Sequence, residues 1–157
     1  MTYLATLPSL LCGLVLCGTD LAHRRVPRAT VALGFVIQLL VLVGVGAWTA
    51  RPWLFMLCTA YGLAAMGMQL GLALLRPGSL GFGDVTVALV IGQALGVFGV
   101  RAFVLWWLLM GVLGLIWIWA WNRYARAEPQ YQAEATPVKV PFVPVMVCAG
   151  LFAAVLG

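Results

Sequence analysis

Charged residues are scarce in this chain. Only 8% of its 157 residues are Asp, Glu, Lys or Arg, whereas soluble domains carry about a quarter. Hydrophobic residues make up 64%, and the mean hydropathy is +1.09. This composition excludes an ordinary soluble domain and indicates an integral membrane protein whose surroundings are the lipid bilayer. The length suits one compact bundle, so we expect a single membrane-embedded domain over residues 1–157.

Convergent metal ligands are also lacking. The chain has one histidine, His23, and four cysteines, all of them within apolar runs and none in a CxxC pair. Zinc sites need convergent Cys and His spacing, so we expect the cysteines to pack as small hydrophobes, with no metal and no cofactor. The net charge is +5, but the arginines stand singly or in small groups between apolar runs. That pattern is typical of membrane topology signals and argues against nucleic-acid binding.

Apolar runs dominate the rest of the sequence and predict an all-α fold, a polytopic bundle of about six transmembrane helices. The N-terminus has no positively charged n-region, so we expect it to be retained as the first helix. A spanning helix needs about 20 residues. The fourth run is short, and it spans only if the glycine segment before it also enters the membrane. The six runs are 2–19, 29–47, 52–75, 85–100, 102–121 and 140–156.

Lysine and arginine are unevenly divided between the two sides of this bundle. Seven of the nine follow the first, third and fifth runs, and only Arg51 and Arg101 lie on the other side. The positive-inside rule predicts that the first group is cytoplasmic and that, with six spans, both termini face outward. Asp20 and Asp84 then lie at cytoplasmic helix ends. The seven are Arg24, Arg25, Arg28, Arg76, Arg123, Arg126 and Lys139.

Two further patterns have structural explanations. Gly67 and Gly71, and Gly92 and Gly96, have the GxxxG spacing of closely packed membrane helices. Tryptophans near the predicted helix ends are typical of interfacial belts. We interpret as belt residues Trp48, Trp53, Trp106, Trp107, Trp117, Trp119 and Trp121.

Acidic residues number only four. Glu128 and Glu134 fall in the polar segment 122–139, a predicted cytoplasmic loop in which solvation explains them. Asp20 and Asp84 instead border apolar runs, where a carboxylate is costly and is a functional candidate. Structural roles remain as alternatives, because Asp84 has the position of a helix cap and Asp20 could pair with a neighbouring arginine.

Two aspartates at one membrane face suggest a specific chemistry. Close carboxyls cannot both ionise cheaply, so they share a proton at intermediate pH. One carboxylate can then take a proton from water while the other, protonated, donates to a peptide carbonyl, as in aspartic proteases. Gly81 and Gly83 would let the backbone approach a substrate strand closely.

Three segments resemble the motifs of the type IV prepilin peptidases, a family of GxGD membrane aspartic proteases. The stretch from Asp20 to Pro27, DLAHRRVP, is similar to the first aspartate motif. The stretch from Gly81 to Asp84, GFGD, is similar to the second, and GQALG follows it at 92–96. PFVP at 141–144 resembles the late Pro-Phe-Gly-Pro segment. The three segments come in the family's order.

The resemblance implies an intramembrane aspartic endopeptidase that cleaves the short basic leaders of prepilins or pseudopilins at the cytoplasmic face of the inner (plasma) membrane. It implies that Asp20 and Asp84 are the catalytic pair. The motif residues that would bind substrate or shape the site are Gly81, Gly83, Pro27, Pro141 and Pro144.

The chain departs from the family pattern at three positions. Thr86 stands where the family usually has Lys, Arg28 where it often has Asn, and Val143 where it has Gly. Nothing here corresponds to the cysteine-rich methyltransferase region of larger members, so we expect no N-methylation activity.

Two alternatives remain. One is a presenilin-like intramembrane protease, whose first aspartate usually follows Tyr, whereas Thr19 precedes Asp20 here. The other is a non-catalytic membrane assembly protein or a small transporter, since proton relays also use membrane carboxylates.

Overall fold

The computed structural model describes residues 2–23, 26–75, 81–127 and 140–157, and every regular element in these ranges is an α-helix. The all-α prediction is therefore confirmed. The helices, in chain order, are α1 (Thr2–Ala5), α2 (Leu7–His23), α3 (Arg28–Trp48), α4 (Leu54–Leu75), α5 (Phe82–Leu95), α6 (Val100–Ala127) and α8 (Val143–Leu156).

Each of the six apolar runs contains one main helix, but several predicted ends are wrong. α2 continues past residue 19 to His23, so Asp20 lies within its last turn. α6 continues past residue 121 to Ala127, so the first part of the segment predicted as a loop is helical. Arg and Ala have high helix propensity, which explains why the helix extends beyond the apolar run. The remainder of that segment, 128–139, lies outside the described residues. α5 begins at Phe82 instead of residue 85 and ends at Leu95 instead of residue 100.

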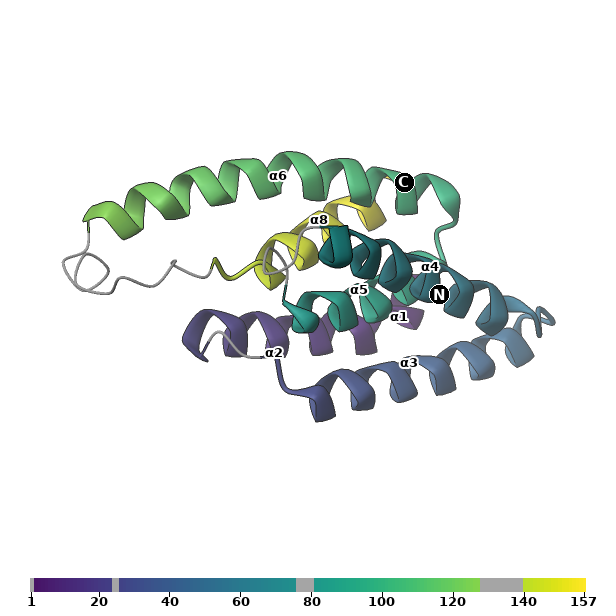
Figure 1. The fold of residues 1–157 in the computed structure, drawn as a ribbon. Helices are drawn as coiled ribbons and strands as arrows, with labels where there is room; N and C mark the ends of the chain where they lie inside the picture. Colours follow the sequence, from purple (N-terminus) through teal and green to yellow (C-terminus); the bar gives the residue numbers. More distant parts are fainter. Residues whose placement is uncertain (1, 24–25, 76–80, 128–139) are drawn as a thin grey trace.

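Three of the helices, α3, α4 and α6, are long and apolar enough to cross a membrane. α2, α5 and α8 are shorter, with 17, 14 and 14 residues. α5 has buried side chains on nearly every side, and it lies among α2, α3, α4 and α8 (Figure 1). A helix enclosed by other helices meets little lipid, so its length need not match the bilayer.

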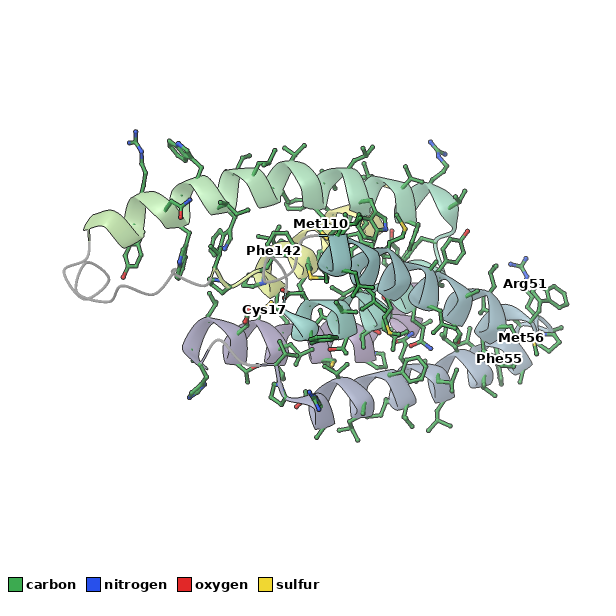
Figure 2. All side chains as sticks on the ribbon, in the orientation of Figure 1. Cys17, Arg51, Phe55, Met56, Met110 and Phe142 are labelled. Atoms are coloured by element: carbon green, nitrogen blue, oxygen red, sulfur yellow. The ribbon has the colours of Figure 1, made fainter. Side chains whose placement is uncertain are left out.

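The helix ends that carry the predicted motifs lie together at one end of the bundle. Figure 1 shows the C-terminal ends of α2 and α6 on the same side as the N-terminal ends of α3, α5 and α8. In Figure 2, Cys17 and Phe142 lie toward this end, whereas Arg51 lies at the opposite end. The alternation of six apolar runs thus brings segments that are far apart in sequence to one end of the molecule.

The closest helix pair is α4 with α5, and only one of the two GxxxG pairs forms it. A Cβ on Gly92 would lie 2.7 Å from the Ala65 Cβ, and one on Gly96 would lie 2.7 Å from the Cys58 Cα. The packing role predicted for these two glycines is confirmed. The same prediction is wrong for Gly67 and Gly71, where an added Cβ would meet nothing within 4 Å among the described residues. GxxxG spacing permits close approach, but the partner helix decides which face uses it.

The interpretation of all seven tryptophans as belt residues is wrong for Trp106. Trp48 and Trp119 are exposed, as belt residues are, but Trp106 is 0% exposed. Its indole Nε1–H donates to the Met146 carbonyl oxygen at 3.0 Å. A buried indole N–H without a hydrogen-bond acceptor would be costly in an apolar environment, and here the acceptor is a backbone carbonyl of α8.

Candidate active site

Asp20 is buried at the junction of α2 and α8. Its side chain is only 7% exposed, and its Oδ2 accepts a hydrogen bond from the Val143 backbone N–H at 3.1 Å. Val143 is the first residue of α8, where backbone N–H groups have no partner within the helix. The helix dipole also makes this N-terminus a favourable place for a carboxylate. The contact joins the first and last motifs that the sequence predicted.

Asp84 is the third residue of α5 and is half-buried. Its Oδ2 accepts a hydrogen bond from the Gly81 backbone N–H at 3.3 Å. This contact is the backward half of a capping box, and the forward half cannot form because Gly81 has no side chain. The capping role considered for Asp84 is therefore present, and a chemical role has to be compatible with it.

The two aspartates share a site at the same end of the bundle. Asp20 lies in the last turn of α2, and Asp84 lies in the first turn of α5. The segments next to them are in contact, because a Cβ on Gly83 would lie 2.7 Å from a side-chain atom of Val26, the Cγ2. The start of α5 thus lies directly against the segment that follows α2.

The two glycines of the GxGD motif differ in their surroundings. At Gly83 a Cβ would lie 2.7 and 2.8 Å from Val26 atoms, so only glycine fits without a shift. At Gly81 the nearest atom to an added Cβ is the Asp84 Oδ2, at 3.5 Å, an ordinary contact. Thr86, at the position of the family's usual lysine, donates its hydroxyl to the Gly83 carbonyl oxygen at 2.8 Å. Gly83 therefore allows helix packing, while a Cβ at Gly81 would make only ordinary contacts with the described atoms.

The three prolines of the predicted site begin helices or precede them. Pro27 is exposed and immediately precedes α3, and its carbonyl oxygen accepts the Val31 N–H at 3.2 Å. Pro144 is the second residue of α8, a position where a missing N–H costs nothing. Pro141 is buried before α8, so the last helix starts at Val143 and not at residue 140 as predicted. All three lie in the segments that border the aspartates.

The sequence did not reveal three residues that shape this site. Val143 reaches Asp20 through its backbone N–H, which no side-chain pattern reports. Val26 sets the space available to Gly83. Trp117 was interpreted as a belt residue, but its Nε1–H donates to the Pro141 carbonyl oxygen at 2.8 Å.

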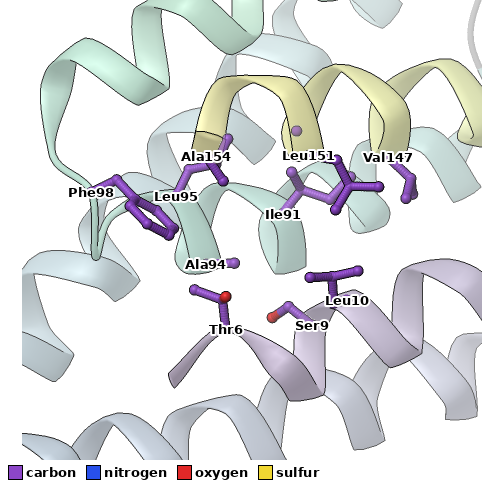
Figure 3. A pocket seen from close by; sticks show the side chains of 11 residues that line it. Thr6, Ser9, Leu10, Ile91, Ala94, Leu95, Phe98, Val147, Leu151 and Ala154 are labelled. Atoms are coloured by element: carbon purple, nitrogen blue, oxygen red, sulfur yellow. The ribbon is translucent and has the colours of Figure 1, made fainter. Parts of the chain in front are cut away.

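A hollow elsewhere in the bundle is not part of this arrangement. It is lined by residues of α5 and α8 and by Thr6, Ser9, Leu10 and Phe98, and Figure 3 shows their side chains around it. The lining is almost entirely apolar and contains none of the predicted site residues. Among the described residues, no three His, Cys, Asp or Glu side chains lie close enough together to hold a metal ion.

Comparison with known proteins agrees with the motifs. A family model described as the type IV leader peptidase family matches residues 7–118, which is more than half of the chain and includes both aspartates. No curated protein and no solved structure matches the chain.

Proposed function

The chain belongs to the type IV leader peptidase family, and we propose that it is an aspartic endopeptidase that removes the leaders of type IV prepilin-like proteins. The family and the apolar helices make it a membrane protein of the protease class. The observation that supports the finer proposal is that the segments carrying Asp20 and Asp84, 64 residues apart in sequence, meet at one end of the bundle, where a Cβ on Gly83 would lie 2.7 Å from the Val26 Cγ2.

In this proposal the two carboxyls share one proton. The ionised carboxyl removes a proton from water, and the water oxygen attacks the carbonyl carbon of the scissile peptide. The protonated carboxyl donates its proton to the carbonyl oxygen. The tetrahedral intermediate then collapses, the C–N bond breaks, and the departing nitrogen takes a proton from the dyad. The Val143 and Gly81 N–H groups orient the two carboxyls during these transfers.

The proposed substrate is a prepilin or pseudopilin with a short basic leader and one hydrophobic helix. Gly81, which has no side chain and accepts a Cβ only at ordinary contact distance from the Asp84 Oδ2, supports this proposal, because an extended peptide must approach the backbone next to the carboxyls. The proposed cleavage site is at the cytoplasmic face of the inner membrane.

A non-catalytic role for the fold is the second candidate, and one observation favours it. Both carboxylates accept hydrogen bonds from backbone N–H groups at helix N-termini, so each could serve structure alone. A structural carboxylate can be replaced by an amide that makes the same bond, whereas a catalytic one cannot. This difference separates the two candidates.

The test of the function is cleavage of a co-expressed prepilin-like protein. We expect the substrate to lose its leader and to migrate faster in gel electrophoresis only when the chain is present. A matched substrate without its basic leader should not change its mobility. A prepilin-like substrate that stays full length in the presence of membrane-inserted chain would contradict the proposal.

The orientation has its own test. We expect a reporter fused after Ala135 to show a cytoplasmic location and one fused after Ala50 to show an external one, because seven of nine basic residues lie on the Asp20 side. Enzymatic reporters that are active only outside the inner membrane, paired with reporters active only inside, measure this directly. An external signal at Ala135 would place the aspartates on the outer face and overturn the cytoplasmic site.

A further inference from the structure

The C-terminal half of α6 lies against the segment that leads into α8. Trp117 donates its indole N–H to the buried Pro141 carbonyl oxygen at 2.8 Å. One turn earlier, Gly114 is buried under the Phe142 ring, and a Cβ there would lie 3.0 Å from Cε2. Residues 114 and 117 share a helix face, so α6 holds two consecutive residues of this segment at once.

The segment 141–142, which contacts α6, leads directly into the residue that donates a hydrogen bond to Asp20. Val143 directly follows Pro141 and Phe142, and its N–H donates to the Asp20 Oδ2 at 3.1 Å. Residues 140–142 are not helical, and Pro141 has no N–H, so this stretch lacks the backbone ladder that would fix it. The contacts with α6 therefore set where the Val143 N–H points.

We propose that Trp117 is a positioning residue for the dyad, which acts through Pro141 and the Val143 N–H to hold the Asp20 carboxylate in its reactive orientation. The proposal rests on the proposed function, since it assigns Asp20 a chemical role. Trp117 itself is kept in place by its ring, which stacks on Trp121 with centroids 6.0 Å apart and planes at 30°. The indole is thus held at one side and donates at the other.

The chain offers a matched control for each of two substitutions. Trp117→Phe removes the N–H and keeps an aromatic ring. Trp106→Phe removes an equivalent bond, from α6 to the Met146 carbonyl of α8 at 3.0 Å, away from Asp20. Gly114→Ala pushes on Phe142, whereas Gly111→Ala adds the same methyl group on the same helix with nothing within 4 Å among the described residues.

Purified enzyme in detergent, with a prepilin-like precursor as substrate, gives the readout. We expect Trp117→Phe and Gly114→Ala to lower kcat by about 10-fold or more with KM little changed, because small misplacements of a catalytic group are costly. The exposed Gly111→Ala control should stay within about twofold of wild type. Trp106→Phe truncates a fully buried ring and therefore measures the general cost of losing a buried indole hydrogen bond to α8. A variant that only reduces the folded fraction lowers the apparent kcat equally at every pH, so the pH profile separates the two effects.

The acid limb of the profile should move to higher pH in Trp117→Phe and Gly114→Ala, because the carboxylate loses an N–H donor that favours its ionised form. Other titratable groups on α2 and on the helices packed against it include Cys17 of α2, Asp84 of α5 and Cys148 of α8. Thiol pKa values lie far above those of carboxyls, so the acid limb reports the aspartates. The controls should leave the limb in place.

The outcomes distinguish this inference from the proposed function. Wild-type kcat and acid limb in both Trp117→Phe and Gly114→Ala, with no cleavage by Asp20→Asn, would overturn the positioning role and leave the function intact. Cleavage by Asp20→Asn would end the proposed function, and the inference with it. Should Trp117→Phe fail to accumulate in the membrane, Gly114→Ala decides the question alone.

Discussion

Asp20→Asn and Asp84→Asn are each expected to abolish leader cleavage while the bundle still inserts and folds. Asparagine is nearly isosteric with aspartate but cannot take or give the proton that the mechanism requires. Loss of one member of such a unit costs about 10⁴-fold or more in rate. The double variant should be no slower than either single variant, because residues that act as one unit are not additive.

The hydrogen bonds of the two aspartates make this a direct test of the structural alternative. An Asn side-chain oxygen can still accept the Val143 N–H at position 20 and the Gly81 N–H at position 84, and Asn caps helices about as well as Asp. Glu134→Gln, an equivalent change in the polar segment, is the matched control and should cleave normally. Persisting cleavage in either Asn variant, at wild-type protein level, would return that aspartate to a capping role.

Gly83→Ala is expected to remove most of the activity, and Gly81→Ala much less. The two substitutions add the same methyl group to the same motif, but only the one at Gly83 meets Val26, at 2.7 and 2.8 Å. The start of α5 must then move away from the segment after α2, which displaces Asp84 from Asp20. Misplacement by about 1 Å can cost about 10²-fold in rate, and overpacking costs about 1–3 kcal/mol of stability.

A second substitution can restore the lost space. Val26→Ala would remove the Cγ2 at 2.7 Å but keep the Cβ at 2.8 Å, whereas Val26→Gly removes both atoms. The pair Gly83→Ala with Val26→Gly should therefore recover much of the activity lost by Gly83→Ala. Rates of prepilin cleavage and thermal unfolding of the purified variants measure the two effects separately. Equal losses for Gly81→Ala and Gly83→Ala, or no recovery in the pair, would contradict the packing explanation and indicate that both glycines are needed for contact with substrate.

The positions of the helices and of the two aspartate motifs could largely be predicted from local sequence patterns. Hydropathy located the six apolar runs, and the spacing of Asp20 to Pro27 and of Gly81 to Asp84 identified the two aspartate motifs. The ends of the helices were less accessible, because α2 and α6 continue beyond the apolar runs into residues that favour helix. Hydropathy reports where a segment meets lipid, and a helix can extend past that boundary.

The sequence by itself determined the class of protein, the helical architecture and the pair of carboxyls, because each follows from composition or from spacing along one segment. The tertiary structure decided that the Val143 N–H meets Asp20, that Gly83 and not Gly81 is crowded, and that Trp117 reaches Pro141 instead of lipid. These features depend on which helix faces meet. A backbone donor has no side-chain signature, and the space at a glycine is set by atoms from a different segment, so only packing could decide them.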